Sequence, residues 1–132
     1  MKLKFFTLLT FLLFTMSAVS QKTIQSLDSQ FNITTNKSIV KYTRTIDKLN
    51  NGQFSVQINF QTGELMMSGT FLDEKLNLPN GEFIYYFANG VKESQGYYYN
   101  GQRVGVWQRW SFDGVKKTDR YYKELTELLT LN

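Results

Sequence analysis

Hydrophobic and polar residues alternate along residues 54–71, and this period of two predicts a β-hairpin. With Thr62-Gly63 as a two-residue loop, the pattern predicts the pairs Gln61–Glu64, Phe60–Leu65, Ile58–Met67, Val56–Gly69 and Phe54–Phe71. This register places every large apolar residue of the hairpin except Met66 on one face. Because a slip by one residue would move half of them into water, we expect the register to be strongly specified.

The stretch 81–114 matches itself when it is shifted by 24 residues. The shift places Gly81 on Gly105, Phe83 on Trp107, Tyr86 on Trp110, Asn89 on Asp113 and Gly90 on Gly114. A shift of 27 residues brings the first hairpin into the same frame, with Val56 on Phe83, Gly63 on Gly90 and Gly69 on Gly96. The extra residues fall in a loop over 73–80. We therefore predict three copies of one hairpin unit, lying side by side.

The glycines at 63, 90 and 114 mark the three hairpin turns. Asn89-Gly90 and Asp113-Gly114 predict type I′ turns, in which both central residues take a positive φ. Pairing from these turns brings Tyr86 opposite Glu93 and Glu82 opposite Tyr97.

The same pairing places Phe83 opposite Gly96, where the ring would cover the backbone that glycine leaves bare. In the last unit Trp107 faces Arg120 instead of a glycine. Such a departure is typical of a terminal repeat, which caps the stack.

The flanking segments divide the chain further. Residues 1–20 begin with two lysines, continue with an apolar run and end in small residues before Gln21, which predicts a cleavable signal peptide. We expect a polar leader over 21–38 with one edge strand, a repeat domain over 39–123, and a tail over 124–132. The tail is predicted to form a short helix or the end of the last strand. The expected location is secreted, periplasmic or in the cell envelope.

Residues 96–107, read together with Asp113-Gly114, resemble the MORN repeat: a glycine, an aromatic residue, an Asn-Gly turn, another glycine and a closing Asp-Gly. The spacing at 81–90 and 105–114 is similar to the bacterial variant known as the YwqK-type antitoxin family. The resemblance covers about residues 54–122 and implies a mainly β fold of stacked antiparallel hairpins in one elongated, twisted sheet. It also implies a binding or scaffolding role, with protein and lipid partners, and no catalytic residues.

The composition excludes several kinds of chemistry. The chain has no His and no Cys, which excludes Ser-His-Asp triads, cysteine nucleophiles and ordinary zinc sites. Loss of residues 1–20 lowers the formal charge from +4 to +2, and the cations are scattered, so nucleic-acid binding has little support. We expect no enzyme, no metal and no cofactor. The remaining enzymatic hypothesis is a glycosidase that uses two acids among Glu82, Glu93, Asp113 and Asp119.

The alternation also predicts a second face of the sheet that is rich in aromatic side chains. The candidate binding residues are Tyr86, Tyr97, Tyr99, Trp110 and Phe112, interleaved with Glu93, Lys117 and Asp119. Such rings can anchor a protein or stack on sugars. The structural alternative is that they form stabilising cross-strand pairs, or that the leader or tail covers them.

These observations favour an exported, non-enzymatic repeat protein that binds or scaffolds another protein, with an antitoxin-like or immunity-like action as one form. The alternative is a surface module for polysaccharides or lipid headgroups. Open strand edges also predict self-association, because unpaired backbone groups invite pairing with another chain.

Overall fold

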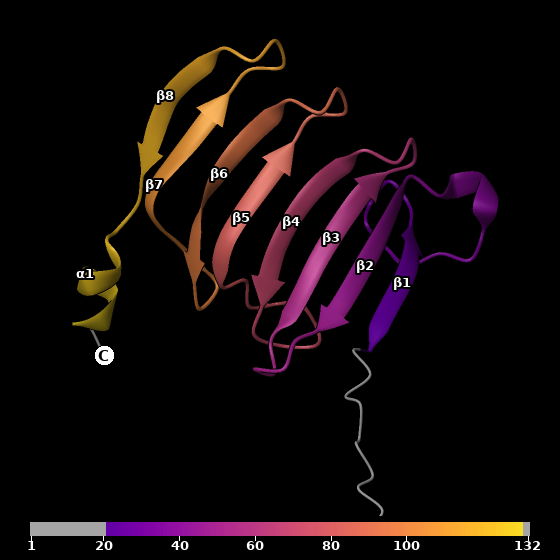
Figure 1. Ribbon diagram of the computed structural model, residues 1–132, viewed down its shortest axis with the longest axis horizontal. Helices are drawn as coiled ribbons and strands as arrows, with labels where there is room; N and C mark the ends of the chain where they lie inside the picture. Colours follow the sequence, from indigo (N-terminus) through magenta and orange to yellow (C-terminus); the bar gives the residue numbers. More distant parts are fainter. Residues whose placement is uncertain (1–20, 131–132) are drawn as a thin grey trace, which may run out of the picture.

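The computed structural model describes residues 21–130, which form one open sheet of eight strands in chain order, each antiparallel to its neighbours (Figure 1). The prediction of stacked antiparallel hairpins in a single sheet is confirmed. The predicted signal peptide, residues 1–20, lies outside the described residues. The strands are β1 (Lys22–Leu27), β2 (Tyr42–Lys48), β3 (Phe54–Phe60), β4 (Leu65–Phe71), β5 (Gly81–Tyr86), β6 (Lys92–Tyr99), β7 (Gln102–Trp110) and β8 (Lys116–Tyr121).

The segments outside the repeats add an edge strand and two short helices. The polar leader supplies β1, which pairs with β2 from Lys22 to Leu27. The 3-10 helix η1 (Lys37–Ile39) begins after Asn36, whose side chain accepts a hydrogen bond from the Ser38 amide at 3.1 Å. The tail forms the short helix α1 (Leu125–Leu129), past the end of β8 in Figure 1. Within residues 21–130, every helix falls short of the length and apolarity that a membrane crossing requires.

The core lies on one face of the sheet, here called the core face. Five residues there are at most 7% exposed: Val56, Ile58, Met67, Phe83 and Trp107. The loop over residues 72–80 folds back and packs Leu76 against this cluster. Asp73 holds the loop closed, because its carboxylate accepts hydrogen bonds from the backbone amides of Asn77 and Leu78 at 2.9 and 2.8 Å. The opposite face is called the back face.

Glycines and bulky side chains alternate in one row across the core face. In this central row, Val56 pairs with Gly69 and Phe83 pairs with Gly96. A methyl group at Gly69 would overlap the ring of Phe83, and one at Gly96 would overlap the indole of Trp107. The predicted Phe83–Gly96 pair is confirmed, but the ring of Phe83 lies over Gly69 of the preceding hairpin. Each ring therefore covers the glycine of the unit before it.

The rings above the central row form a continuous edge-to-face chain. The centroid of Phe83 lies 5.3 Å from that of Phe71 and 4.8 Å from that of Tyr98. Tyr98 in turn lies 5.1 Å from Trp107, which continues the chain to Tyr122 at 6.3 Å. Edge-to-face pairs of this kind contribute about 0.5–1.5 kcal/mol each beyond the area they bury. They allow a single layer to bury its own aromatic residues.

The glycine turns are in the predicted places, but their predicted type is wrong. Gly63, Gly90 and Gly114 each have a positive φ. The amide of each donates a hydrogen bond to the backbone carbonyl three residues earlier, which belongs to Phe60, Phe87 and Ser111 respectively. The preceding Thr62, Asn89 and Asp113 keep a negative φ, so the loops have three residues and a glycine bulge. The two-residue loop with two positive φ values occurs at Asn100-Gly101 instead.

The extra loop residue shifts the register next to each turn. The pairs Phe54–Phe71, Val56–Gly69 and Ile58–Met67 are confirmed, whereas Leu65 pairs with Asn59 and not with Phe60. Leu65 consequently lies on the back face, and Met66 packs against the core, contrary to prediction. In the second hairpin Glu82–Tyr97 is confirmed, but Tyr86 pairs with Lys92 and Glu93 is left in a bulge. The predicted Trp107–Arg120 pair is also confirmed.

We expect Gly69→Ala to destabilise the protein by about 1–3 kcal/mol, because the added methyl group overlaps the Phe83 ring. Urea unfolding measures this loss. Ser68→Ala, at the next position and on the back face, is the control and should change little. In a Phe83→Leu background the cost of Gly69→Ala should shrink. An equal cost in both backgrounds would mean that the ring and the glycine are not coupled.

Candidate functional site

The five predicted binding residues do not form one surface. Tyr97 and Tyr99 lie on β6, and Tyr86 pairs with Lys92 near the far end of the same hairpin. Trp110 lies between two ammonium groups, with Lys92 Nζ 5.2 Å and Lys116 Nζ 5.5 Å from its ring centroid. Phe112, in the turn after β7, packs edge-to-face on Phe87 at 5.5 Å. The rings of Trp110 and Phe112 thus have structural partners within the protein.

Tyr97 and Tyr99 instead belong to an exposed apolar area on the back face. Tyr97 is 54% exposed and Tyr121, on β8, is 75% exposed. Val106 lies between them, since it pairs with Tyr121 and lines two hollows together with Tyr97. We call the group the tyrosine patch; its members are Tyr97, Tyr99, Val106, Tyr121 and Leu125 of α1. Contiguous exposed apolar surface of this kind is a common mark of an interaction site.

Two adjoining hollows run along the tyrosine patch. One, of about 280 Å³, lies among Tyr97, Tyr99 and Leu125. The other, of about 210 Å³, lies between Gln95 and Gln108. Both are lined by Tyr97 and Val106, so they form one groove between β6 and β7.

An irregularity in β7 accounts for the groove. Tyr97 pairs with Val104 and Gln95 with Gln108, so residues are left over in β7 around Gly105. Gly105 has a φ of 61°, a conformation that glycine adopts without strain. Within this interruption the carbonyl of Tyr97 accepts a hydrogen bond from Nε1 of Trp107 at 3.2 Å. The repeated glycine at this position therefore shapes the surface as well as the strand.

A separate hollow, on the core face, is rich in cations. This basic cleft has a volume of about 340 Å³, and its charged lining residues are Arg103, Arg109, Lys117, Arg120 and Glu93. Lys117 and Glu93 were predicted on the other face. Bulges explain the difference: Glu93 is unpaired in β6, and an extra residue in β8 puts Lys117 opposite Arg109.

Arg103 of the basic cleft has both hydrogen-bond and ring partners. Its guanidinium lies 4.5 Å from the centroid of Trp107 and donates to the hydroxyls of Tyr98 and Tyr122 at 3.1 and 3.0 Å. That hydrogen bond from Arg103 holds the pKa of Tyr122 below its ordinary value. Burial, reinforced by Tyr98, raises the pKa of Tyr85. The sequence gives no sign of this cluster, because its cations are spread from residue 103 to residue 120.

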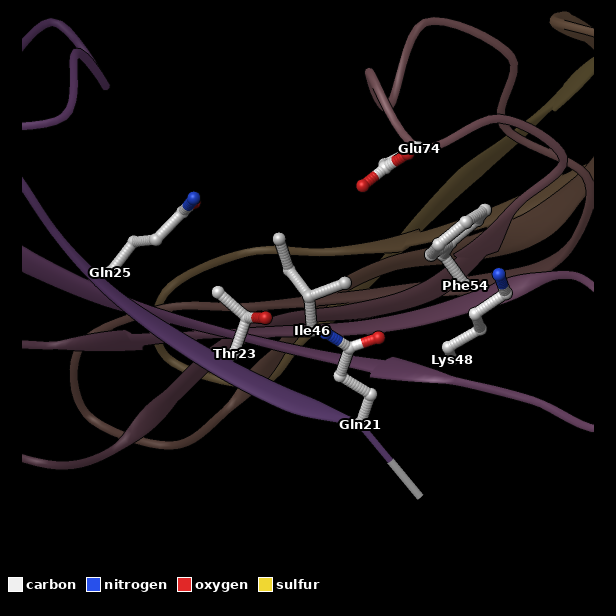
Figure 2. A pocket seen from close by; sticks show the side chains of 7 residues that line it. All are labelled: Gln21, Thr23, Gln25, Ile46, Lys48, Phe54 and Glu74. Carbon is white, nitrogen blue, oxygen red and sulfur yellow. The ribbon is translucent and has the colours of Figure 1, made fainter. Parts of the chain in front are cut away.

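Another hollow, at the opposite end of the core face, is lined by one cation and one acid. It has a volume of about 240 Å³ and lies over β1, β2 and β3. Figure 2 shows Lys48 on the sheet and Glu74 reaching over from the 72–80 loop. Its other lining residues are mostly uncharged: Gln21, Thr23, Gln25, Ile46 and Phe54.

The acids proposed for glycoside hydrolysis are separated. Glu82 accepts a hydrogen bond from Gln95 on the back face, whereas Glu93 lines the basic cleft on the core face. Asp113 lies in a turn, where the Ser111 hydroxyl lowers its pKa. Asp119 lies 3.4 Å from Lys116 Nζ. Over residues 21–130, no group of three or more acidic side chains is placed to hold a metal ion.

Comparison with known proteins finds no matching family model, curated protein or solved structure. The resemblance to MORN repeats therefore stays a prediction.

We expect Arg103→Lys to destabilise the protein by about 1–3 kcal/mol, because a lysine cannot span both phenol hydroxyls while stacking on Trp107. Arg109→Lys, on the same strand, is the matched control, and its unfolding free energy should change by less than about 0.5 kcal/mol. Urea titration followed by tryptophan fluorescence compares the two. Equal losses would show that the phenol contacts of Arg103 contribute no stability.

Proposed function

We propose that this chain is an exported, non-enzymatic repeat protein that binds another protein through the tyrosine patch. One observation carries the proposal: the patch presents Tyr97 and Tyr121 to solvent, with more than half of each side chain exposed although Leu125 of α1 borders the patch. Tyrosine is favoured at protein interfaces because it offers a large contact area with few rotatable bonds.

The shape of the patch supports this proposal. Trp107 of the central row is buried on the opposite face of the same strands, so the backbone that carries the patch is already packed before a partner binds, and we expect little order to be created on binding. The groove beside Val106 offers a recess for an inserted side chain. Partner anchors that fill such recesses usually supply most of the binding energy.

Binding through the patch is tested with the double variant Tyr97→Ala/Tyr121→Ala. Both side chains are more than half exposed, so the variant should fold normally. Quantitative affinity capture from envelope and extracellular fractions should recover a partner with the unaltered protein, and direct titration of that partner should show at least about a tenfold loss of affinity in the variant. Phe112→Ala, an exposed ring outside the patch, is the control. A partner held equally by the patch variant would contradict the proposal.

A carbohydrate is the second candidate ligand, and one observation favours it. Gln95 and Gln108 lie beside Tyr97 in the groove, which combines an aromatic ring with amide groups. Sugars bind to such combinations because the aromatic ring packs on the C–H face of the sugar while the amide groups form hydrogen bonds with its hydroxyls.

This candidate is tested with a glycan array and by calorimetry of the hits. Binding should be lost in Tyr97→Ala and weakened in Gln108→Ala, and Phe112→Ala should bind as the unaltered protein does. An array without hits, together with a captured protein partner, would decide for the protein-binding function.

A further inference from the structure

The lining of the basic cleft carries more positive than negative charge, and Asp113, in the turn before β8, is an acid whose charge interacts with Lys117 from outside the lining. Four cationic side chains and one carboxylate line it, which leaves an excess of three positive charges. Over residues 21–130 there is one ion pair, Lys116–Asp119, and neither member is among the cleft residues. A hollow that gathers one sign of charge focuses the electric field and attracts the opposite sign.

Two of these cations are direct neighbours across the sheet. Arg109 of β7 pairs with Lys117 of β8, and both point to the core face. Like charges placed directly opposite each other destabilise a sheet. Arg120 lies on the same face and pairs with the buried Trp107, so it also lacks an acidic partner across the strand. An anion between these groups would turn the repulsion into attraction.

Arg103 is held in position without being neutralised. Its hydrogen bonds go to the hydroxyls of Tyr98 and Tyr122, which carry no charge in their ordinary state. A guanidinium has five N–H donors, and these bonds use two of them. The remaining donors have a fixed direction, because the group also stacks on Trp107. A pre-oriented guanidinium fork suits the oxygens of a phosphate group.

The charge excess is confined to one end of the core face. The hollow in Figure 2, at the other end, combines Lys48 with Glu74 and has no such imbalance. The volume of the basic cleft, about 340 Å³, is near the lower end of the range of about 300–1,000 Å³ for small-molecule sites. Both observations favour a small, highly charged ligand over a polymer.

We propose that the basic cleft binds a small soluble oxyanion with at least two negative charges, such as a pyrophosphate group or a phosphate ester. Arg109, Lys117 and Arg120 neutralise the ligand, and Arg103 orients it. The site lies on the opposite face from the tyrosine patch and does not depend on the function proposed for that patch.

Isothermal titration calorimetry of the purified protein with pyrophosphate tests the proposal. Pyrophosphate should bind at low ionic strength, more weakly at physiological ionic strength, and more tightly than orthophosphate, which carries less charge. The double variant Arg109→Gln/Lys117→Gln should bind at least about tenfold more weakly. Lys48→Gln, in the balanced hollow, is the control and should bind as the unaltered protein does.

Thermal unfolding without ligand separates binding from folding. The double variant removes a like-charge pair, so it should be at least as stable as the unaltered protein. A less stable double variant would overturn the argument from unneutralised charge. The absence of binding heat with pyrophosphate, or equal affinity in the double variant, would also overturn the proposal. Binding to anionic phosphatidylglycerol vesicles with no response to pyrophosphate would replace the soluble ligand with a membrane surface.

Discussion

A single-layer sheet has to bury its large side chains against its own neighbours, and here the central row makes this possible. Glycine at 69 and at 96 leaves bare backbone on which the rings of Phe83 and Trp107 lie. Any larger residue at those glycines would lift the rings off the sheet. The burial of Phe83 and Trp107 to 1% and 2% exposure therefore depends on two missing side chains as much as on the rings themselves.

The two faces of the sheet differ because the central row occupies only one of them. Aromatic residues of the core face contact one another in a continuous chain, whereas Tyr97 and Tyr121 on the back face remain open to solvent. Bulges then modify each face locally. The irregularity at Gly105 opens the groove beside the tyrosine patch, and the bulge in β8 turns Lys117 toward Arg109. Both candidate sites thus arise where the regular ladder is interrupted.

The centre of each hairpin could be predicted from the sequence, and the ends could not. The alternation from Phe54 to Ile58 fixes which face is buried, so the central pairs follow from the pattern alone. At the turns, an Asx-Gly pair is compatible with a two-residue loop or with a three-residue loop and bulge. These two loops differ in length by one residue, and this difference decides on which face Glu93, Lys117 and Met66 lie. Which of the two loops forms depends on the packing between hairpins.

The same limit applies to the sites. Tyr97 and Tyr99 could be placed on the second face, because they lie in the regular part of β6. Tyr86, Trp110 and Phe112 share their chemistry but lie near turns. There Trp110 contacts Lys92 and Lys116, and Phe112 contacts Phe87 of the neighbouring hairpin. The basic cleft gathers residues from three strands, and no local pattern indicates it.

The most direct test of the central row is the NMR chemical shift of the glycine α protons. Aromatic rings shield protons that lie over their faces, so the α protons of Gly69 and Gly96 should be shifted strongly upfield of those of the turn glycines Gly63 and Gly90, where an added Cβ would meet open space. Gly96 should also show nuclear Overhauser contacts to the indole of Trp107. Ordinary shifts at both glycines, without contacts to the rings, would contradict this account of how the sheet is held together.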